Sequence, residues 1–253
     1  MTEAEPSALL LEGVAAIRED SLTGERRTAV QDVSLRVQHG ERVALVGANG
    51  AGKTSLLLAL VGATESQGRI VVNGTELSKR TLERVRQQLG FVFANPADQL
   101  FCDTVHEEVA FGPRCQGLAE GEVQSRTNDA IAQLELAALR DKYPGALSLG
   151  EQRRVAIAAV LSCAPKLILL DEPSASLDGR ARKRLLGTLD SLSATCIVAT
   201  HDLDLVLELK MRVVALHEGH VVADGTAEQV LLDRAILERA ALEPPLSAGV
   251  RCP

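Results

Sequence analysis

A glycine-rich segment, Gly47–Thr54, limits the fold of this chain more than any other feature of its sequence. It reads Gly-Ala-Asn-Gly-Ala-Gly-Lys-Thr and matches the pattern GxxxxGK[ST] in full. It follows Glu41–Gly47, an apolar run typical of a strand buried on both faces, and it precedes the predicted helix Lys53–Val61. A strand, a glycine loop and a helix start in this order place backbone N–H groups around an anion. The pattern therefore predicts a phosphate-binding loop.

The residue types in this loop each have a chemical role. Glycines let the backbone curl around a phosphate, the Lys53 ammonium reaches the β- and γ-phosphates of a nucleotide, and the Thr54 hydroxyl binds Mg²⁺. We therefore predict that the chain binds a nucleotide. The predicted phosphate-binding residues are Gly47, Ala48, Asn49, Gly50, Ala51, Gly52, Lys53, Thr54 and Ser55.

Polar side chains follow two further apolar strands. Leu167–Leu170 leads into Asp171 and Glu172, and Cys196–Thr200 leads into His201. An aspartate at the end of a buried strand suits a Mg²⁺ ligand, and the glutamate after it suits a general base for in-line attack on a γ-phosphate. Two acids after a strand are a weak signal alone, but the upstream phosphate loop makes this interpretation specific.

Strands alternate with helices along most of the chain. We predict strands at Leu9–Ile17, Ala29–Val37, Arg69–Val72, Leu167–Leu170, Cys196–Thr200, Val213–Leu216 and His220–Ala223, and helices at Glu122–Leu134, Gly150–Ser162 and Ala181–Leu192. The first two strands, bounded by polar turns, favour an antiparallel sheet, whereas the alternation favours a mainly parallel α/β sheet. Residues 91–146 interrupt the alternation and indicate an inserted helical subdomain.

The composition excludes several classes of protein. Of the 253 residues, 46% are hydrophobic, yet no apolar run approaches the ~18 residues of a membrane span. Residues 1–6 carry no Lys or Arg, so they do not resemble a secretory signal. The five cysteines lack CxxC or CxxH spacing, which argues against a disulfide framework or a zinc site. A net charge of −7 without a basic run argues against a nucleic-acid partner.

The segment Leu147–Arg154 reads Leu-Ser-Leu-Gly-Glu-Gln-Arg-Arg and lies between the phosphate loop and the acidic strand end. It resembles the signature of ATP-binding cassette (ABC) ATPases, whose common form is LSGGQ, with Leu149 and Glu151 in place of Gly and Gln. Asp178 at the D-loop position and His201 at the switch position also fit that family. The resemblance implies a P-loop NTPase (RecA-like) core with an antiparallel β subdomain and an inserted α-helical subdomain.

This resemblance implies an ATPase that uses ATP and Mg²⁺. Family members bind two ATP molecules between two head-to-tail subunits, so the implied partner is a second copy of the chain or a similar ATPase. The signature of one subunit then acts on the ATP of the other; here these residues are Ser148, Leu149, Gly150 and Glu151. Ser148 is a good N-cap, and the amides after it can face a γ-phosphate. The predicted catalytic residues are Glu172 and His201, and the predicted Mg²⁺ ligands are Thr54 and Asp171.

Residues 91–113 resemble the corresponding segment of cobalt/nickel and energy-coupling-factor (ECF) importer ATPases, which is close to FQNPDDQLF followed by TV-x-E-x-V-x-F-G. The resemblance implies a surface that receives a helix of an integral membrane subunit. The predicted docking residues are Asp98, Gln99, Phe101 and Phe111, whereas Phe91 and Phe93 are expected in the core. The ATPase would lie at the cytoplasmic face of the membrane and drive import of cobalt or nickel ions, or of a vitamin such as biotin.

Two positions depart from the family pattern. Ala94 stands where the family has the Q-loop glutamine, which touches Mg²⁺ and the attacking water, and alanine cannot coordinate anything. We therefore expect slow hydrolysis unless water or Asn95 fills the gap. The family usually stacks adenine on an aromatic residue after the first strand, where this chain has Ile17 and Arg18. An apolar contact or a guanidinium stack would replace it, and we expect GTP to compete well with ATP.

We predict a single ABC ATPase domain over residues 1–245, with its core at 1–90 and 147–230 and the insert at 91–146, and a tail at 246–253. Two other functions stay open. One is a cytosolic ABC-type ATPase of DNA repair or translation, although such chains usually carry a coiled-coil insert or two cassettes. The other is a nucleotide-binding regulatory subunit with weak hydrolysis. The turn at residues 217–220 is expected to be a hairpin turn in water and not a metal site.

Overall fold

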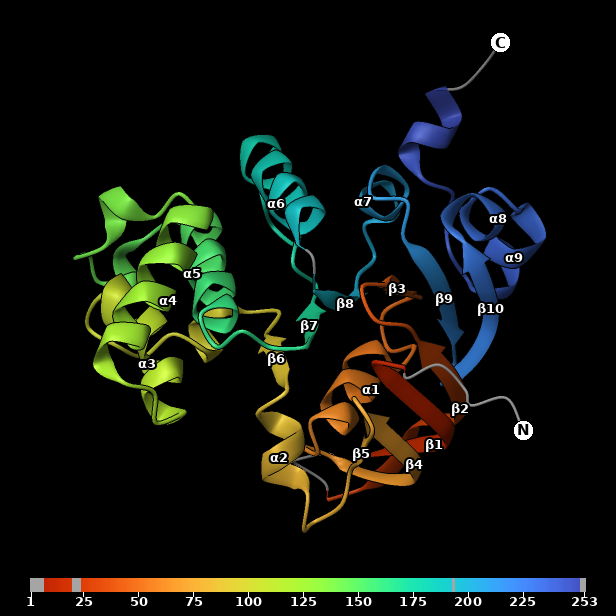
Figure 1. Cartoon of the computed structure of the whole chain (residues 1–253). Helices are drawn as coiled ribbons and strands as arrows, with labels where there is room; N and C mark the ends of the chain where they lie inside the picture. Colours follow the sequence, from red (N-terminus) through yellow and green to blue (C-terminus); the bar gives the residue numbers. More distant parts are fainter. Residues whose placement is uncertain (1–6, 20–23, 193, 251–253) are drawn as a thin grey trace.

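The computed structural model describes residues 7–19, 24–192 and 194–250, which form two β-sheets and a set of helices (Figure 1). The predictions for residues 1–6 and for the end of the tail lie outside the described residues. The first sheet is antiparallel, in the order β2-β1-β4-β5. Its strands are β1 (Leu9–Glu19), β2 (Arg26–Val37), β4 (Glu65–Val72) and β5 (Thr75–Glu76). The predicted antiparallel subdomain is confirmed.

The second sheet has six strands in the order β10-β9-β3-β8-β7-β6, and all neighbours are parallel except the β9–β10 hairpin. Its strands are β3 (Arg42–Val46), β6 (Leu89–Val92), β7 (Leu167–Asp171), β8 (Thr195–Ala199), β9 (Arg212–His217) and β10 (His220–Thr226). The apolar runs that predicted buried strands form the middle of this sheet. The predicted α/β fold with a mainly parallel sheet is therefore confirmed.

The helices lie between and around the sheets. They are α1 (Lys53–Leu60), α2 (Leu82–Arg86), α3 (Val105–Cys115), α4 (Glu120–Gln133), α5 (Leu149–Leu161), α6 (Gly179–Ser191), α7 (Leu203–Glu208), α8 (Ala227–Leu231) and α9 (Arg234–Arg239). Short 3₁₀ turns occur at Pro96–Asp98, Ala137–Leu139, Pro144–Ala146 and Leu246–Val250. In the described part of the chain, no helix combines the length and the apolar character needed to cross a lipid bilayer.

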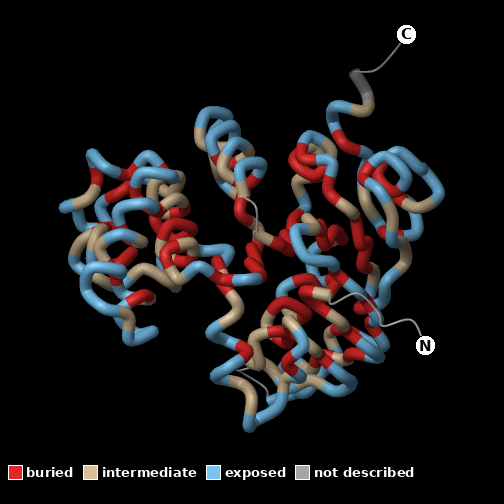
Figure 2. Tube along the Cα trace, in the orientation of Figure 1, coloured by how far each residue is buried: buried red, intermediate tan, exposed pale blue. Residues whose placement is uncertain are grey.

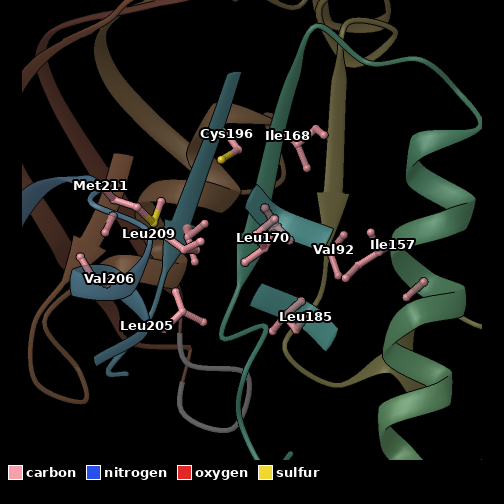
Figure 3. Packing of buried hydrophobic residues seen from close by; sticks show 14 of the residues in the cluster. Val92, Ile157, Ile168, Leu170, Leu185, Cys196, Leu205, Val206, Leu209 and Met211 are labelled. Carbon is pink, nitrogen blue, oxygen red and sulfur yellow. The ribbon is translucent and has the colours of Figure 1, made fainter. Parts of the chain in front are cut away.

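Buried residues are concentrated in the strands and on the helices beside them (Figure 2). They form two layers on opposite faces of the parallel sheet. Successive side chains of a strand point to opposite faces, and in β7 Ile168 and Leu170 join one layer while Leu167 and Leu169 join the other. The second layer fills the space between the two sheets and α1. The first layer packs the sheet against helices, as Figure 3 shows for Val92 of β6 beside Ile157 of α5. This first layer packs the helices against β6, β7 and β8.

The boundaries of the insert differ from the prediction. Phe91 and Val92 pair with Leu169 and Leu170 of β7, so the insert begins after residue 92 and not at residue 91. Helix α5, which we assigned to the core half of the domain, packs against α3 and α4 in one group at the side of the sheets (Figure 1). Motif order in the sequence could not show this, because the packing partners of α5 are set by its buried residues on several faces.

Candidate nucleotide-binding and catalytic site

The predicted phosphate-binding loop and the predicted catalytic residues meet at one edge of the parallel sheet. Strands β3, β8 and β7 are neighbours and run in the same direction, so their carboxyl ends lie side by side. The loop after β3, the acids at the end of β7 and His201 after β8 are therefore close together. The Glu172 N–H donates to the Ala199 carbonyl at 2.8 Å, and the Thr200 N–H donates to the Leu45 carbonyl at 3.0 Å. In open α/β sheets this edge is the usual place for a ligand.

The glycines of the loop are required by close backbone packing. A Cβ on Gly47 would lie 2.4 Å from the Leu216 carbonyl oxygen, and one on Gly52 would lie 2.5 Å from the Ala29 carbonyl oxygen. Gly52 also has a φ of +104°, a conformation that other residues rarely adopt. The loop thus fits between β9 and β2 only with glycine at these positions, and α1 begins directly after it, as predicted.

A pocket of about 830 Å³ opens over this loop. Residues Asn49 to Ser55 line it along with Glu172, whereas Gly47 and Ala48 lie behind it, where their carbonyls accept hydrogen bonds from Lys53. The other lining residues are Arg18, Glu25, Arg27, Thr28, Ala29 and Glu218. The pocket therefore joins the predicted phosphate-binding loop to the ends of β1 and β2.

Lys53 is buried and its ammonium faces several oxygen atoms. It donates to the Gly47 carbonyl at 2.8 Å and to the Ala48 carbonyl at 3.3 Å, and it lies 3.7 Å from Glu172 Oε1. An ammonium held among acceptors in a pocket is a strong anchor for a phosphate, because hydrogen bonds to charged groups are the stronger ones.

Thr54 and Asp171 form an oxygen-only pair next to Lys53. The Thr54 hydroxyl lies 2.9 Å and 3.1 Å from the two carboxylate oxygens of Asp171. Burial raises the pKa of the Asp171 carboxyl, while the Thr54 hydroxyl opposes that shift. Mg²⁺ prefers hard oxygen ligands such as these, so the residues present fit the predicted ion.

Glu172 and His201 are in direct contact. His201 Nδ1 lies 2.8 Å from Glu172 Oε2, and the His201 N–H donates to the same oxygen at 3.2 Å. The Glu172 side chain is 16% exposed and the His201 side chain 62% exposed. The carboxylate is thus held at the pocket wall with one oxygen toward His201 and the other toward Lys53, an arrangement suited to accepting a proton from water.

The signature residues lie outside this pocket. Ser148 caps α5: its hydroxyl accepts from the Glu151 N–H, and Glu151 in turn accepts from the Ser148 N–H at 2.8 Å. These bonds to Ser148 hold the pKa of Glu151 below its ordinary value. A Cβ on Gly150 would lie 3.0 Å from Ala181 Cβ, and Asp178 caps α6 through the Ala181 N–H at 2.7 Å. The signature therefore presents a helix start to solvent, next to the D-loop.

The model of the family described as "ABC transporter" matches residues 30–175, which hold the phosphate loop, the signature and the acidic strand end. The chain belongs to the ABC transporter family. It is the ATP-binding subunit type of that family and an ATPase. The resemblance stated from its motifs is thereby confirmed, as is the ABC ATPase fold.

Three known proteins show how far the similarity extends. The chain is 43% identical to the "Cobalt import ATP-binding protein CbiO" of Rhodobacter capsulatus over 86% of this chain and 80% of that protein. It is 30% identical to the solved cbiO1 of Clostridium perfringens, part of an ABC transporter complex, with a TM-score of 0.80 over 97% of this chain and 99% of that chain. A dimeric ATP-binding cassette bound to ADP and Pi is 25% identical, with a TM-score of 0.76 over 87% and 98%.

The described residues that line the pocket of this ABC ATPase include no aromatic side chain on which adenine could stack. Of the two predicted adenine contacts, Arg18 lines the pocket, whereas Ile17 is half-buried and its carbonyl accepts from the Thr64 hydroxyl. Sequence reasoning missed Glu218. Glu218 lines the pocket because the next residue, Gly219, is held beside the loop: its N–H donates to the Ala51 carbonyl and its carbonyl accepts from the Gln31 N–H. Competition by GTP stays a prediction.

The predicted docking residues of this ABC ATPase divide into two groups. Phe101 and Phe111 are exposed at 64% and 45%, and their rings meet edge to face with centroids 4.8 Å apart. Asp98 is also exposed. Gln99 instead turns inward, where its amide accepts from the Phe93 N–H and donates to the Ala156 carbonyl. The structure thus gives Gln99 an internal contact.

A buried carboxylate fixes the loop that carries Phe101. The buried Glu108 carboxylate accepts the N–H groups of Phe101 and Cys102, both at 2.8 Å. Burial, followed by the nearby Glu108 charge, raises the pKa of the Cys102 thiol to about 11.

Phe93, which we expected in the core, is 39% exposed because β6 ends at Val92. That expectation was wrong for Phe93, whereas Phe91 is half-buried against the core.

The degenerate Q-loop position lies on an exposed turn. Ala94 is exposed, and the neighbouring Asn95 uses its side chain locally. Its oxygen accepts from the Ala97 N–H at 3.3 Å and its amide donates to Asp98 at 3.2 Å. With Gln99 turned inward as well, neither amide side chain near Ala94 is free to replace the missing glutamine.

Proposed function

We propose that this ABC ATPase energises a membrane importer of the cobalt/nickel or ECF type, with cobalt or nickel ions or a vitamin such as biotin as the transported substrate. One observation carries the proposal: the aromatic pair Phe101 and Phe111 stands exposed on a buried, hydrogen-bonded support, in the segment whose motif resembles those importers. The relative named for cobalt import supports it. The carrier protein in the membrane would select the substrate.

The catalytic unit of this proposal is a pair of chains, homodimeric or with a similar ATPase, at the cytoplasmic face of the membrane. Ser148 and Gly150 lie outside the pocket that holds Lys53, which supports the proposal that they act on a nucleotide bound by another chain. The first amides of α5 then add hydrogen bonds and a positive helix end to that γ-phosphate. The dimeric cassette among the solved structures supports this arrangement.

The proposed mechanism gives each residue of the nucleotide site a role. Thr54 and Asp171 would hold Mg²⁺, which neutralises developing charge on the phosphates when it is bound. Lys53 anchors the phosphates, and Glu172 accepts the proton of the attacking water. His201 is bonded to Glu172 at 2.8 Å, and we expect it to orient that carboxylate and to contact the γ-phosphate. Closure of the two chains excludes water, and release of products opens them.

Co-purification from solubilised membranes of the source organism tests the proposed function. We expect the chain to retain an integral membrane subunit, together with a carrier that holds the transported metal or vitamin. The double substitution Phe101→Ala and Phe111→Ala is expected to lower the retained subunit at least tenfold, because buried aromatic anchors dominate the energy of most protein interfaces. The measurement is quantitative mass spectrometry of the eluate.

Tyr143→Ala is the matched control, since Tyr143 is another exposed aromatic residue, at 59%, and lies outside the docking segment. The control is expected to retain the subunit at the parent level. Equal retention by the double variant would contradict the docking surface, and the absence of any integral membrane protein from the eluate would contradict the importer itself.

Ala94→Gln is expected to raise ATP turnover, on the order of tenfold, by restoring a polar contact to the attacking water. We expect the increase as higher basal turnover or as tighter coupling in the complex with the membrane subunit. Steady-state phosphate release measures both. Ala97→Gln, at an exposed position of the same turn, controls for the added amide. An unchanged rate, both alone and in complex, would refute the role assigned to Ala94.

A further inference from the structure

Arg153 is a buried arginine that the mechanism above does not use. It is 2% exposed, and it lies on α5 two residues after Glu151 and about one helical turn after Leu149, the first residue of the helix. Its Nη1 donates to the Glu172 carbonyl at 3.0 Å and its Nη2 to the Ala175 carbonyl at 3.4 Å. Among the described residues no carboxylate lies within ion-pair distance of it, and its Nε has no hydrogen-bond partner.

A guanidinium is a costly group to bury at this position. Removing a charge from water without an ion-pair partner is unfavourable, and an apolar side chain of similar size fills such a space without that cost. What the guanidinium adds is a rigid fork that reaches two backbone carbonyls at once. Both carbonyls belong to the turn that follows β7, so the fork fixes the backbone of Glu172.

That turn is held in an unusual conformation. Glu172 has a φ of +45° and Ser176 a φ of +59°, a region that residues with a Cβ rarely adopt. The Glu172 N–H donates to Ala199 on the β8 side, and the Ala175 N–H donates to the Glu172 carbonyl at 3.2 Å. On the α5 side, the Arg153 guanidinium donates hydrogen bonds to the Glu172 and Ala175 carbonyls of this turn.

The same helix carries the signature. Ser148 and Gly150 lie at the start of α5, where Gly150 packs against Ala181 and Leu177 of the D-loop region. Because Arg153 on the same helix donates to the Glu172 carbonyl, a shift of α5 reaches the Glu172 turn. An element whose position affects two sites is the physical requirement for coupling between them.

We propose that Arg153 is a positioning residue that fixes the Glu172 backbone from the signature helix, so that engagement of the partner's ATP by α5 sets the general base of this chain. The inference rests on the proposed role of Glu172 as general base. It concerns a residue that does not touch the nucleotide and acts only through the Glu172 turn.

Arg153→Lys tests this inference, because lysine keeps the charge and loses the two-carbonyl fork. We expect kcat for ATP hydrolysis to fall about 10²-fold, the effect of displacing a catalytic group by about 1 Å, while KM for ATP changes less than about twofold. Arg86→Lys is the matched control: Arg86 lies on α2, outside the signature segment, and donates to the Val61 and Gly62 carbonyls at 2.9 and 3.2 Å. Its kcat is expected to stay within about twofold of the parent.

A double variant separates positioning from a general structural role. In the Glu172→Gln background, Arg153→Lys is expected to cause no further loss of kcat, because the group through which it acts is already absent. Thermal unfolding confirms that each variant is folded. If Arg153→Lys does not fold, Arg153→Gln, which donates one hydrogen bond without a buried charge, carries the same predictions.

Parent-level kcat in the folded Arg153 variant would overturn the inference and leave the role of Glu172 intact. A further multiplicative loss in the Glu172→Gln background would also overturn it, because Arg153 would then act elsewhere. Full turnover in Glu172→Gln alone would instead overturn the general-base assignment, and with it the route through Arg153.

Discussion

Glu172→Gln is expected to lower ATP turnover by about 10²–10⁴-fold while ATP still binds, because the amide keeps the shape of the side chain and cannot accept a proton from water. The carboxylate lies between His201 Nδ1 at 2.8 Å and Lys53 Nζ at 3.7 Å, at the wall of the nucleotide pocket. The substitution removes one charge from this wall and leaves Lys53 and Thr54 in place. Steady-state phosphate release and equilibrium binding of ATP are the two measurements.

Glu218→Gln is the matched control for this variant. Glu218 lines the same pocket and carries the same charge, but it lies on the β9–β10 turn, next to Gly219, whose carbonyl accepts from the Gln31 N–H of β2. Its turnover is expected to stay within about twofold of the parent, because general-base catalysis belongs to one positioned group and not to the charge of the pocket. Equal losses in both variants would point to pocket charge as the cause and remove Glu172 from the catalytic role.

Lys53→Met is expected to weaken ATP binding about 10- to 100-fold, the equivalent of one hydrogen bond to a charged group. The Lys53 ammonium is buried and has Gly47, Ala48 and Glu172 oxygens around it, so it is held ready to bind the phosphates. Methionine fills a similar volume without the charge, and the fold is therefore expected to be retained. Titration calorimetry with ATP and Mg²⁺ measures the change.

Lys79→Met controls for the loss of a lysine, since Lys79 is exposed and lies outside the pocket. ATP affinity in this control is expected to match the parent. Affinity within about twofold of the parent in Lys53→Met would mean that the loop does not bind phosphate through its lysine.

The sequence predicted those parts of the site that depend on local signals. The loop at residues 47–54 and the acids after β7 were predicted because a buried strand, a run of glycines and a helix start are each short patterns. Parallel pairing of β3, β8 and β7 then brings their ends together without further information. The prediction that Ser148 caps a helix likewise rested on local sequence. In the structure Ser148 and Glu151 bond reciprocally as a capping box.

The parts that were missed depend on contacts between distant segments. Arg153 was visible in the signature, but its bonds to the Glu172 and Ala175 carbonyls follow from how α5 packs beside β7. Glu218 was considered only as a residue of a hairpin turn. Phe93 was expected in the core, whereas β6 ends at Val92 and Phe93 is exposed. A sequence pattern does not determine these distances.

We propose that the ATP site is completed by the signature of a second chain. Sedimentation of the Glu172→Gln variant in Mg·ATP tests it most directly, because ATP that is bound and not hydrolysed keeps the two chains together. We predict a species of twice the 26.9 kDa chain mass with ATP and a single chain without it. Adding Ser148→Arg to this variant is predicted to restore the single chain in ATP. A mass that does not respond to ATP, or an ATP-dependent pair that persists with Ser148→Arg, would contradict the claim.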